Sequence, residues 1–181
     1  YGYDIASGEI EWEYYIGSDL NGSPVVTEDG CLLVSVEKQF IAGNGGMLKL
    51  DPSKAPEDAL VWYFPTGNKG LLTWNGGVIG SASVNDKYKE KGIKSLAAFS
   101  GIDGYLYVVD YKSTDGTTKS FDGRTTVDKP ELVFQYKIGQ SISTPIIFKD
   151  KLIAAGYGGI YLFEFDSDMN FTLLDKKPLY F

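Results

Sequence analysis

Short apolar runs alternate with turns rich in Gly, Asp and Pro along most of the chain, and adjacent runs predict β-hairpins. Three predicted hairpins share this form and lie at residues 23–36, 80–100 and 143–155. The clearest turn is Thr27-Glu28-Asp29-Gly30, which separates two apolar strands. The abundance of Tyr and Gly also suits short strands joined by tight turns, so the pattern predicts an all-β chain.

Each predicted hairpin is followed by the same elements: a Gly-rich turn, an apolar strand that ends in Asp, a polar turn and a last strand. The Asp-ended strands are expected at 47–51, 105–110 and 160–166, and the last strands at 60–64, 132–136 and 171–174. The strand-ending Asp residues are about 50–60 residues apart. This spacing is typical of four-stranded β-propeller blades that carry insertions.

The chain begins inside such a repeat, because residues 3–4 end a strand, 5–8 form a turn and 9–12 begin the next strand. With no initiator Met and no signal peptide at this start, we expect a processed or excised piece of a longer protein. The predicted fold is an all-β propeller of four-stranded antiparallel blades, forming a partial ring of about three and a half blades. The single domain 1–181 is predicted to contain approximate blades at 1–18, 19–66, 67–139 and 140–181.

Elementary physics explains the pattern. Gly supplies positive φ at turns, and a strand-ending Asp can accept hydrogen bonds from turn amides. A Trp such as Trp12, at the start of an outer strand, buries a large apolar surface between blades. One blade cannot bury both of its faces alone, so neighbouring blades must stack. Open edges and bare faces are therefore expected to need missing blades or a partner chain.

Two segments interrupt the repeat. Residues 85–94 are polar and Lys-rich, and residues 112–130 form a long insertion rich in Gly, Thr and Asp. Both are predicted to be surface loops. The longer one is either a binding loop or solvated decoration.

The charge and composition exclude several functions. A formal net charge of −7 disfavours nucleic-acid and anionic-lipid partners, and no apolar run is long enough to span a bilayer. The chain has no His, which removes Ser-His-Asp triads, Cys-His dyads and His-ligated metals. A carboxylate-only site or an oxygen-ligated Ca²⁺ stays open. The single Cys31 excludes an intrachain disulfide and is predicted to be buried.

Two local motifs have a polar-site appearance, and each is better interpreted as a turn. Residues 166–170 have the acidic spacing of a Ca²⁺ loop, but Phe171 and Lys177 stand where an EF-hand needs Gly and Glu. Residues 43–46 are Gly-rich, yet no Gly-Lys-Ser/Thr follows, so a hairpin turn is predicted. The glycosylation acceptor pattern occurs at Asn21 and Asn170.

Aromatic residues are the remaining candidates for a binding surface. The set comprises Tyr14, Tyr15, Trp62, Tyr63, Trp74, Tyr105, Tyr107, Tyr157 and Tyr161. Most are predicted to lie in the core between blades, and the rest could stack on sugars or peptides at a propeller rim. Trp74, on a predicted connection between blades, is the best single candidate for an exposed aromatic.

The motif Asp4-x-x-x-Gly8-x-x-x-Trp12, followed by Gly22-Ser23-Pro24-Val25-Val26, resembles the repeat of pyrroloquinoline-quinone-like β-propellers. This repeat is shared by quinoprotein alcohol dehydrogenases, the outer-membrane assembly lipoprotein and many secreted bacterial proteins. The later units depart from it: no Gly lies between Asp51 and Trp62, and Phe134 replaces Trp in the next unit. The resemblance implies a periplasmic or extracellular location.

The resemblance does not specify an activity. Quinoprotein dehydrogenases have an adjacent Cys pair, a bound Ca²⁺ and a catalytic Asp, whereas this chain has only Cys31 and no mappable ligand set. We therefore expect no cofactor and assign no catalytic, cofactor-binding or metal residue. The expected function is a non-catalytic binding or scaffold module with a protein or carbohydrate partner. The alternative is part of a quinone-dependent dehydrogenase, or a propeller domain attached to a separate enzyme domain.

Overall fold

The structure is a computed structural model that describes residues 1–178, and its regular elements are β-strands apart from one short 3-10 turn, η1 (Pro56–Asp58). The predicted all-β chain is confirmed. The last three residues of the predicted unit 140–181 lie outside the described part of the chain.

The strands form one two-stranded and three four-stranded antiparallel sheets, each in chain order. The half-sheet contains β1 (Gly2–Tyr3) and β2 (Ile10–Trp12). Sheet I contains β3 (Val25–Val26), β4 (Leu32–Val36), β5 (Gly46–Leu50) and β6 (Leu60–Pro65). Sheet II contains β7 (Ser83–Val84), β8 (Leu96–Ser100), β9 (Tyr105–Lys119) and β10 (Thr126–Lys137). Sheet III contains β11 (Ile146–Phe148), β12 (Lys151–Gly156), β13 (Gly159–Phe165) and β14 (Phe171–Lys177).

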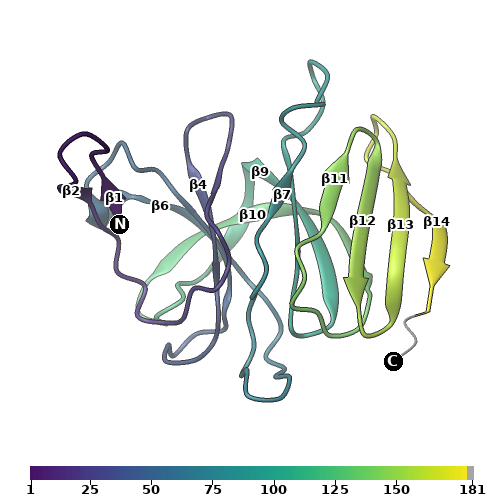
Figure 1. Ribbon diagram of the computed structural model, residues 1–181, viewed down its shortest axis with the longest axis horizontal. Coiled ribbons are helices and arrows are strands. Elements are labelled where there is room, and N and C mark those ends of the chain that lie inside the picture. The colour runs from purple at the N-terminus through teal and green to yellow at the C-terminus, as the bar shows by residue number, and fades with distance from the viewer. Residues whose placement is uncertain (179–181) are drawn as a thin grey trace.

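The sheets follow one another as an open series of layers. Figure 1 shows the half-sheet at one end, sheets I and II in the middle and sheet III at the other end. The N-terminus and the end of the described chain lie at opposite ends of this series (Figure 1). The described residues do not close the series into a ring.

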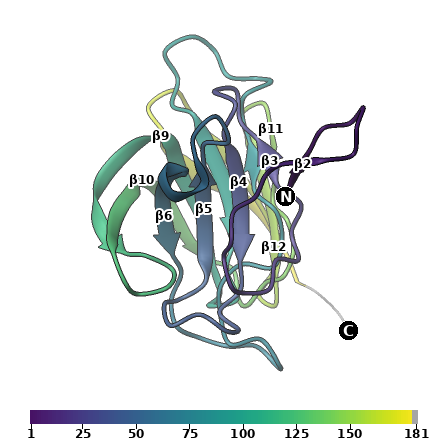
Figure 2. The ribbon, with the colours of Figure 1, turned by 90° about the vertical axis from the view of Figure 1, so that its left-hand side faces the viewer.

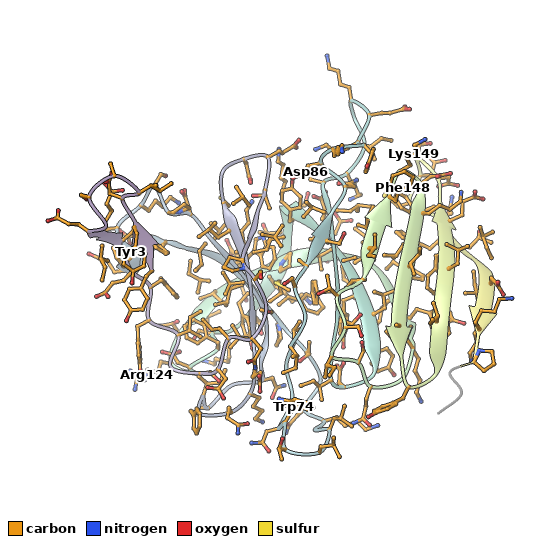
Figure 3. All side chains as sticks on the ribbon, in the orientation of Figure 1. Tyr3, Trp74, Asp86, Arg124, Phe148 and Lys149 are labelled. Carbon is orange, nitrogen blue, oxygen red and sulfur yellow. The ribbon has the colours of Figure 1, made fainter. Side chains whose placement is uncertain are left out.

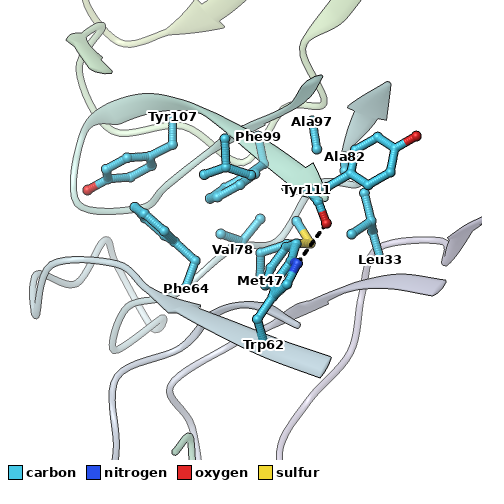
Figure 4. Packing of buried hydrophobic residues seen from close by; sticks show 11 residues of the cluster. Leu33, Met47, Trp62, Phe64, Val78, Ala82, Ala97, Phe99, Tyr107 and Tyr111 are labelled. Atoms are coloured by element: carbon cyan, nitrogen blue, oxygen red, sulfur yellow. Dashed lines mark hydrogen bonds between the residues drawn. The ribbon is translucent and has the colours of Figure 1, made fainter. Parts of the chain in front are cut away.

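Alternation along the strands of sheet II places two apolar faces back to back. Ala97 and Phe99 contribute to the core shared with sheet I, whereas Leu96 and Ala98 contribute to the core shared with sheet III. Successive side chains of a strand point to opposite faces, so one strand serves both cores. Figure 4 shows the first of these cores, with Trp62 of sheet I packed against sheet II.

In every layer but sheet III, an aromatic pair at the last strand packs against the next layer. Trp62 and Phe64 lie in the core between sheets I and II, and Phe134 and Tyr136 pack in the core between sheets II and III. Trp12, which ends β2, and Tyr14, just after it, pack in the same way on the outer face of sheet I. The sequence pattern that placed Trp residues between layers is therefore confirmed for Trp12 and Trp62.

The indole N–H groups are paired across these interfaces. Trp62 Nε1 donates to the carbonyl oxygen of Tyr111 at 3.0 Å, drawn as a dashed line in Figure 4. Trp12 Nε1 donates to the carbonyl oxygen of Lys54 at 3.1 Å. Both acceptors lie just after the strand-ending Asp of the next layer, at Asp110 and Asp51. A buried indole N–H that lacked such a partner would cost about 1–3 kcal/mol.

The strand-ending Asp residues close their turns as predicted. The Asp51 carboxylate accepts from the Ser53 backbone N–H at 3.0 Å, and the Asp4 carboxylate accepts from that of Ser7 at 2.6 Å. The Asp166 carboxylate accepts from the N–H of Asp168 at 2.9 Å. These bonds satisfy turn amides that have no partner in the sheet ladder.

A second repeated contact joins the short first strands of the layers. The Ser23 N–H donates to the Ser81 hydroxyl at 2.8 Å, and the Ser81 N–H donates to the Thr144 hydroxyl at 2.9 Å. These residues precede β3, β7 and β11 respectively. Sheets II and III therefore each supply a hydroxyl acceptor to the backbone of the layer before them.

The predicted loop at residues 85–94 is confirmed as the connection between β7 and β8, and Figure 1 shows it projecting beyond the sheets. The predicted loop at 112–130 is wrong. Strands β9 and β10 extend through most of this segment as one long hairpin, with Gly116 (φ 76°) and a register shift around Pro130. β-Branched residues such as Thr117, Thr118 and Val127 sustain the ladder despite the Gly and Asp content.

The extended hairpin, here called the strap, reaches back across sheet I. Figure 2 shows β9 and β10 curving past the β6 edge of that sheet. Phe121 at its tip is buried against Tyr63 and Tyr14, and its carbonyl oxygen accepts from the Gly43 N–H at 3.0 Å. A Cβ at Gly43 would lie 2.5 Å from that oxygen, so this position needs Gly. The Gly-rich segment 43–46 therefore belongs to the β4–β5 hairpin connection, as predicted, and also approaches the strap closely at Gly43.

Replacing a Trp between layers should lower the free energy of unfolding much more than replacing a peripheral Trp. Trp62→Ala removes a side chain that is 1% exposed, and we expect it to lower the free energy of unfolding by about 3–5 kcal/mol. Trp74→Ala, at a half-buried position, serves as the matched control and should cost about 1 kcal/mol or less. Urea unfolding followed by fluorescence measures both, and equal losses would contradict the layer model.

Candidate binding sites

The sequence motifs with a polar-site appearance have structural partners. Asn170 Nδ2 donates to the Asp166 carboxylate at 2.9 Å, and the Asn170 backbone N–H donates to the same carboxylate. These bonds complete the turn at 166–170 that the sequence favoured. Asn21 Nδ2 donates to the Glu37 carboxylate. The amides of both potential glycosylation sites therefore take part in local hydrogen bonds.

Cys31 is a core thiol, as predicted. Its side chain is 7% exposed, and burial raises the pKa of the thiol. A raised pKa keeps it protonated at neutral pH, so it is a weak nucleophile.

Trp74 lies on the connection between sheets I and II, as predicted, but it is only half-exposed. Its backbone exchanges two hydrogen bonds with Leu71, each 2.9 Å, which closes a tight turn. Figure 3 places it at the lower rim of the molecule, and it lines neither of the two cavities described below.

The first cavity, here called the aromatic cavity, has a volume of about 700 Å³ and lies at the N-terminal end of the layer series. Residues that link β2 to β3 form most of its wall, together with Tyr1 and Phe40. Its polar and aromatic lining includes Tyr14, Tyr15, Glu13 and Asp19. Tyr14 and Tyr15 belong to the aromatic set identified in the sequence.

Alternation along the linking segment positions this wall. Ile16 is buried in the core on sheet I, while Tyr15 beside it is 89% exposed. Gly17 (φ 77°) turns the chain directly after Ile16, and a Cβ there would lie 3.3 Å from the Tyr15 ring. Tyr14 stacks on Trp12 at a ring separation of 6.1 Å and meets the edge of Phe121 at 6.3 Å. The cavity wall is therefore held by sheet I and the strap.

A buried acid lies behind the cavity wall and contacts Ser18, one of the residues that line the cavity. Glu37 is 2% exposed, and the Ser18 hydroxyl donates to its carbonyl oxygen at 2.6 Å. Burial raises the pKa of the Glu37 carboxyl; the Asn21 amide opposes the shift and the charge of Asp19 adds to it. Burial and the charge of Asp122 likewise raise the pKa of Tyr14. Burial is the main cause of both shifts.

The second cavity, here called the mixed cavity, has a volume of about 600 Å³ and lies between the 85–94 loop and sheet III. Its wall includes Tyr88, Phe165, Lys89, Lys149, Glu90 and Asp166. Tyr88 also meets Phe148 edge-on at 5.0 Å, and Figure 3 shows Phe148 and Lys149 beside each other at this rim. Both charge signs are present, so the wall has no strong preference for one ligand charge.

An ion network joins sheets I and II beside the mixed cavity. Lys112 Nζ lies 2.6 Å from the Glu28 carboxylate, and Lys89 Nζ contacts the same carboxylate. The Glu28 backbone N–H donates to Asp86 at 2.9 Å. The two lysines lower the pKa of Glu28 to about 2. This network is an interlayer contact between side chains that are already paired with one another.

The adjacent cysteine pair that lies against the quinone in the dehydrogenases is absent from this chain. Cys31 is the only cysteine and lies in the core, so no adjacent Cys pair can form. Within residues 1–178, His, Cys, Asp and Glu nowhere gather in a group of three or more able to hold a metal ion. The adjacent Cys pair of the dehydrogenases therefore has no counterpart in this chain.

No protein-family model and no curated protein matches the chain. In the part of the chain that the structure describes, no helix has the length and apolarity to cross a membrane.

The sequence pointed to only part of the aromatic cavity. Tyr14 and Tyr15 belong to the aromatic set, but Phe40 lies far from them in sequence. Asp19 is close to them but belongs to no recognisable motif. The available signal was the series of carboxylates between Asp4 and Asp19, which contains no basic residue.

Glu28→Gln should weaken the protein at neutral pH and reduce its sensitivity to acid. The folded-state pKa is depressed below its ordinary value of 4.5. The carboxylate therefore stabilises the fold above that pH and loses this contribution as pH falls towards about 2. In thermal unfolding between pH 7 and pH 2, the melting temperatures of the wild type and of Glu28→Gln should differ at neutral pH and converge at the acid end. Glu57→Gln, on the exposed η1 turn, is the control; a constant gap for Glu28→Gln would oppose this assignment.

Proposed function

We propose that the chain is an arc of a β-propeller of the pyrroloquinoline-quinone-like repeat type, acting as a non-catalytic binding or scaffold module. In this proposal, sheets I, II and III are blades and the half-sheet is the outer half of another blade. The resemblance of residues 4–26 to that repeat supports the assignment. It also underlies a proposed periplasmic or extracellular location.

The observation that carries the proposal is the repeated register inside the layers. The residue two positions before each strand-ending Asp pairs with the interlayer aromatic: Gly2 with Trp12, Lys49 with Trp62 and Val108 with Phe134. In sheet III the same position pairs Glu164 with Thr172. Equivalent positions along four units support a single repeated blade, and repeats of this kind are stable only when stacked.

The outer face of sheet III supports the partial-ring part of the proposal. Ile146, Ile153 and Ile160 on this face are 57%, 40% and 41% exposed. Leu162, on the same face, occupies the position of Met47 and Leu106, which are fully buried against the next sheet. We propose that a further four-stranded sheet of the same repeat covers the half of this face nearest β11. The hydroxyl–amide contacts that lead from Ser23 to Thr144 would continue into it.

A chain extended by a second copy of residues 140–177 tests this occupant. Ile153→Asp should cost about 1 kcal/mol in the 181-residue chain, because the side chain is partly exposed to solvent and the remaining cost is the poor strand propensity of Asp. In the extended chain the same substitution should cost about 2 kcal/mol or more, because it buries an unpaired charge. Chemical denaturation of the four proteins gives both differences. The same small cost in both backgrounds would exclude a docked sheet.

The proposed role is binding at the open rims, with a protein or carbohydrate as partner. The aromatic and mixed cavities both open to solvent and are lined by aromatic and polar side chains that layered sheets hold in place. Rigid scaffolds that present such concave surfaces are typical of binding modules.

Two measurements on the purified chain test the proposed role. A redox-dye assay with added quinone and Ca²⁺ should show no turnover, and sustained turnover would replace the binding module with a dehydrogenase. Peptide and glycan arrays should show selective retention of one ligand class. Failure to retain members of either class would contradict the binding role.

A further inference from the structure

Negative charge is concentrated at the N-terminal end of the layer series. Residues 1–20 contain five carboxylates (Asp4, Glu9, Glu11, Glu13 and Asp19) and no Lys or Arg. The rest of the chain carries nineteen acidic and seventeen basic side chains, so this short segment accounts for five of the seven net negative charges. Such a local excess attracts cations even when the protein as a whole is only moderately acidic.

The aromatic cavity lies within this acidic end. Its wall combines the rings of Tyr14, Tyr15 and Phe40 with the carboxylates of Glu13 and Asp19, and no Lys or Arg lines it. Phe40 and Tyr15 are 73% and 89% exposed, so their ring faces are accessible to a ligand. The mixed cavity differs in this respect, because Lys89 and Lys149 line it.

Aromatic rings beside carboxylates favour one class of ligand. The face of an aromatic ring is electronegative and attracts an ammonium or guanidinium group, and a nearby carboxylate adds a direct ionic attraction. An anionic ligand would be repelled, and a neutral sugar would use the rings but gain nothing from the carboxylates.

We propose that the aromatic cavity binds a lysine or arginine side chain of a partner peptide. This inference rests on the proposed binding function and names its ligand class. The cation lies against the ring faces, with Glu13 and Asp19 providing the opposite charge. Lys and Arg also carry apolar stems, which cover exposed aromatic surface while the charged end stays near the carboxylates.

NMR titration of the full 181-residue protein tests the proposal with matched probes. The first probe is the peptide acetyl-Gly-Lys-Gly-amide, and the second replaces Lys by norleucine, which has a similar shape but no charge. Butylammonium and cellohexaose are the third and fourth. We expect shift changes for the lysine peptide that are confined to residues 13–20 and Phe40 and that weaken as salt is raised.

Several outcomes overturn the proposal. One is that the norleucine peptide changes the shifts as much as the lysine peptide does. Another is that the shift changes lie at the mixed cavity. A third is that cellohexaose binds more tightly than the lysine peptide, which favours a sugar site. Binding of butylammonium as tightly as the lysine peptide would identify a free amine as the ligand and overturn the peptide.

Variants locate the binding energy within the cavity. Asp19→Asn and Tyr15→Leu should each weaken binding of the lysine peptide about two- to fivefold, from loss of one charge or one ring. Glu57→Gln and Phe148→Leu remove a carboxylate and a ring elsewhere and should leave the affinity unchanged. Spectra of the free variants outside the cavity should match the wild type, which separates lost binding from lost folding. Unchanged affinity in both cavity variants overturns the assignment.

Failure here is distinguishable from failure of the proposed function. If the cationic probes do not bind while an array retains another ligand class, the proposed binding function is kept and the proposed cation site is rejected. If the chain turns over substrate with quinone, the proposed function falls whatever the titration shows.

Discussion

Burial of an aromatic pair between successive sheets is the interaction on which the rest of the structure depends. A single sheet exposes two apolar faces that it cannot bury by itself, so its stability comes from packing against neighbouring sheets. Trp62 shows how specific the contact is, because its ring fills the interface while its N–H pairs with the Tyr111 backbone. The same arrangement at Trp12, with a different acceptor, shows that position in the layer determines the role.

The layers are equivalent in register but not in chemistry. Where the half-sheet and sheets I and II have an aromatic residue, sheet III has Thr172. Its outer face carries the exposed Ile146, Ile153 and Ile160, but also an ion pair between Lys151 of β12 and Glu164 of β13. This mixture explains why that face is compatible with solvent in part and with a further sheet in part.

Much of the fold could be predicted because it is encoded locally. Apolar runs, Gly turns and strand-ending Asp residues each act within a few residues, and the interlayer position of Trp62 follows from the repeat. The strap was missed because Gly116, Asp122 and Gly123 suggest a loop, whereas its pairing depends on Thr residues and on contacts with sheet I. The aromatic cavity was found only in part, because Phe40 joins the N-terminal segment through tertiary structure.

The strap changes how the layers are connected mechanically. In a simple stack each layer touches only its nearest neighbours, so the end layers can open one at a time. Here Phe121, carried by the middle sheet, reaches past sheet I and packs on Tyr14 at the N-terminal end. Fraying of that end therefore requires a contact with the centre of the molecule to break, which makes the first three layers one cooperative unit and leaves sheet III as the separable element.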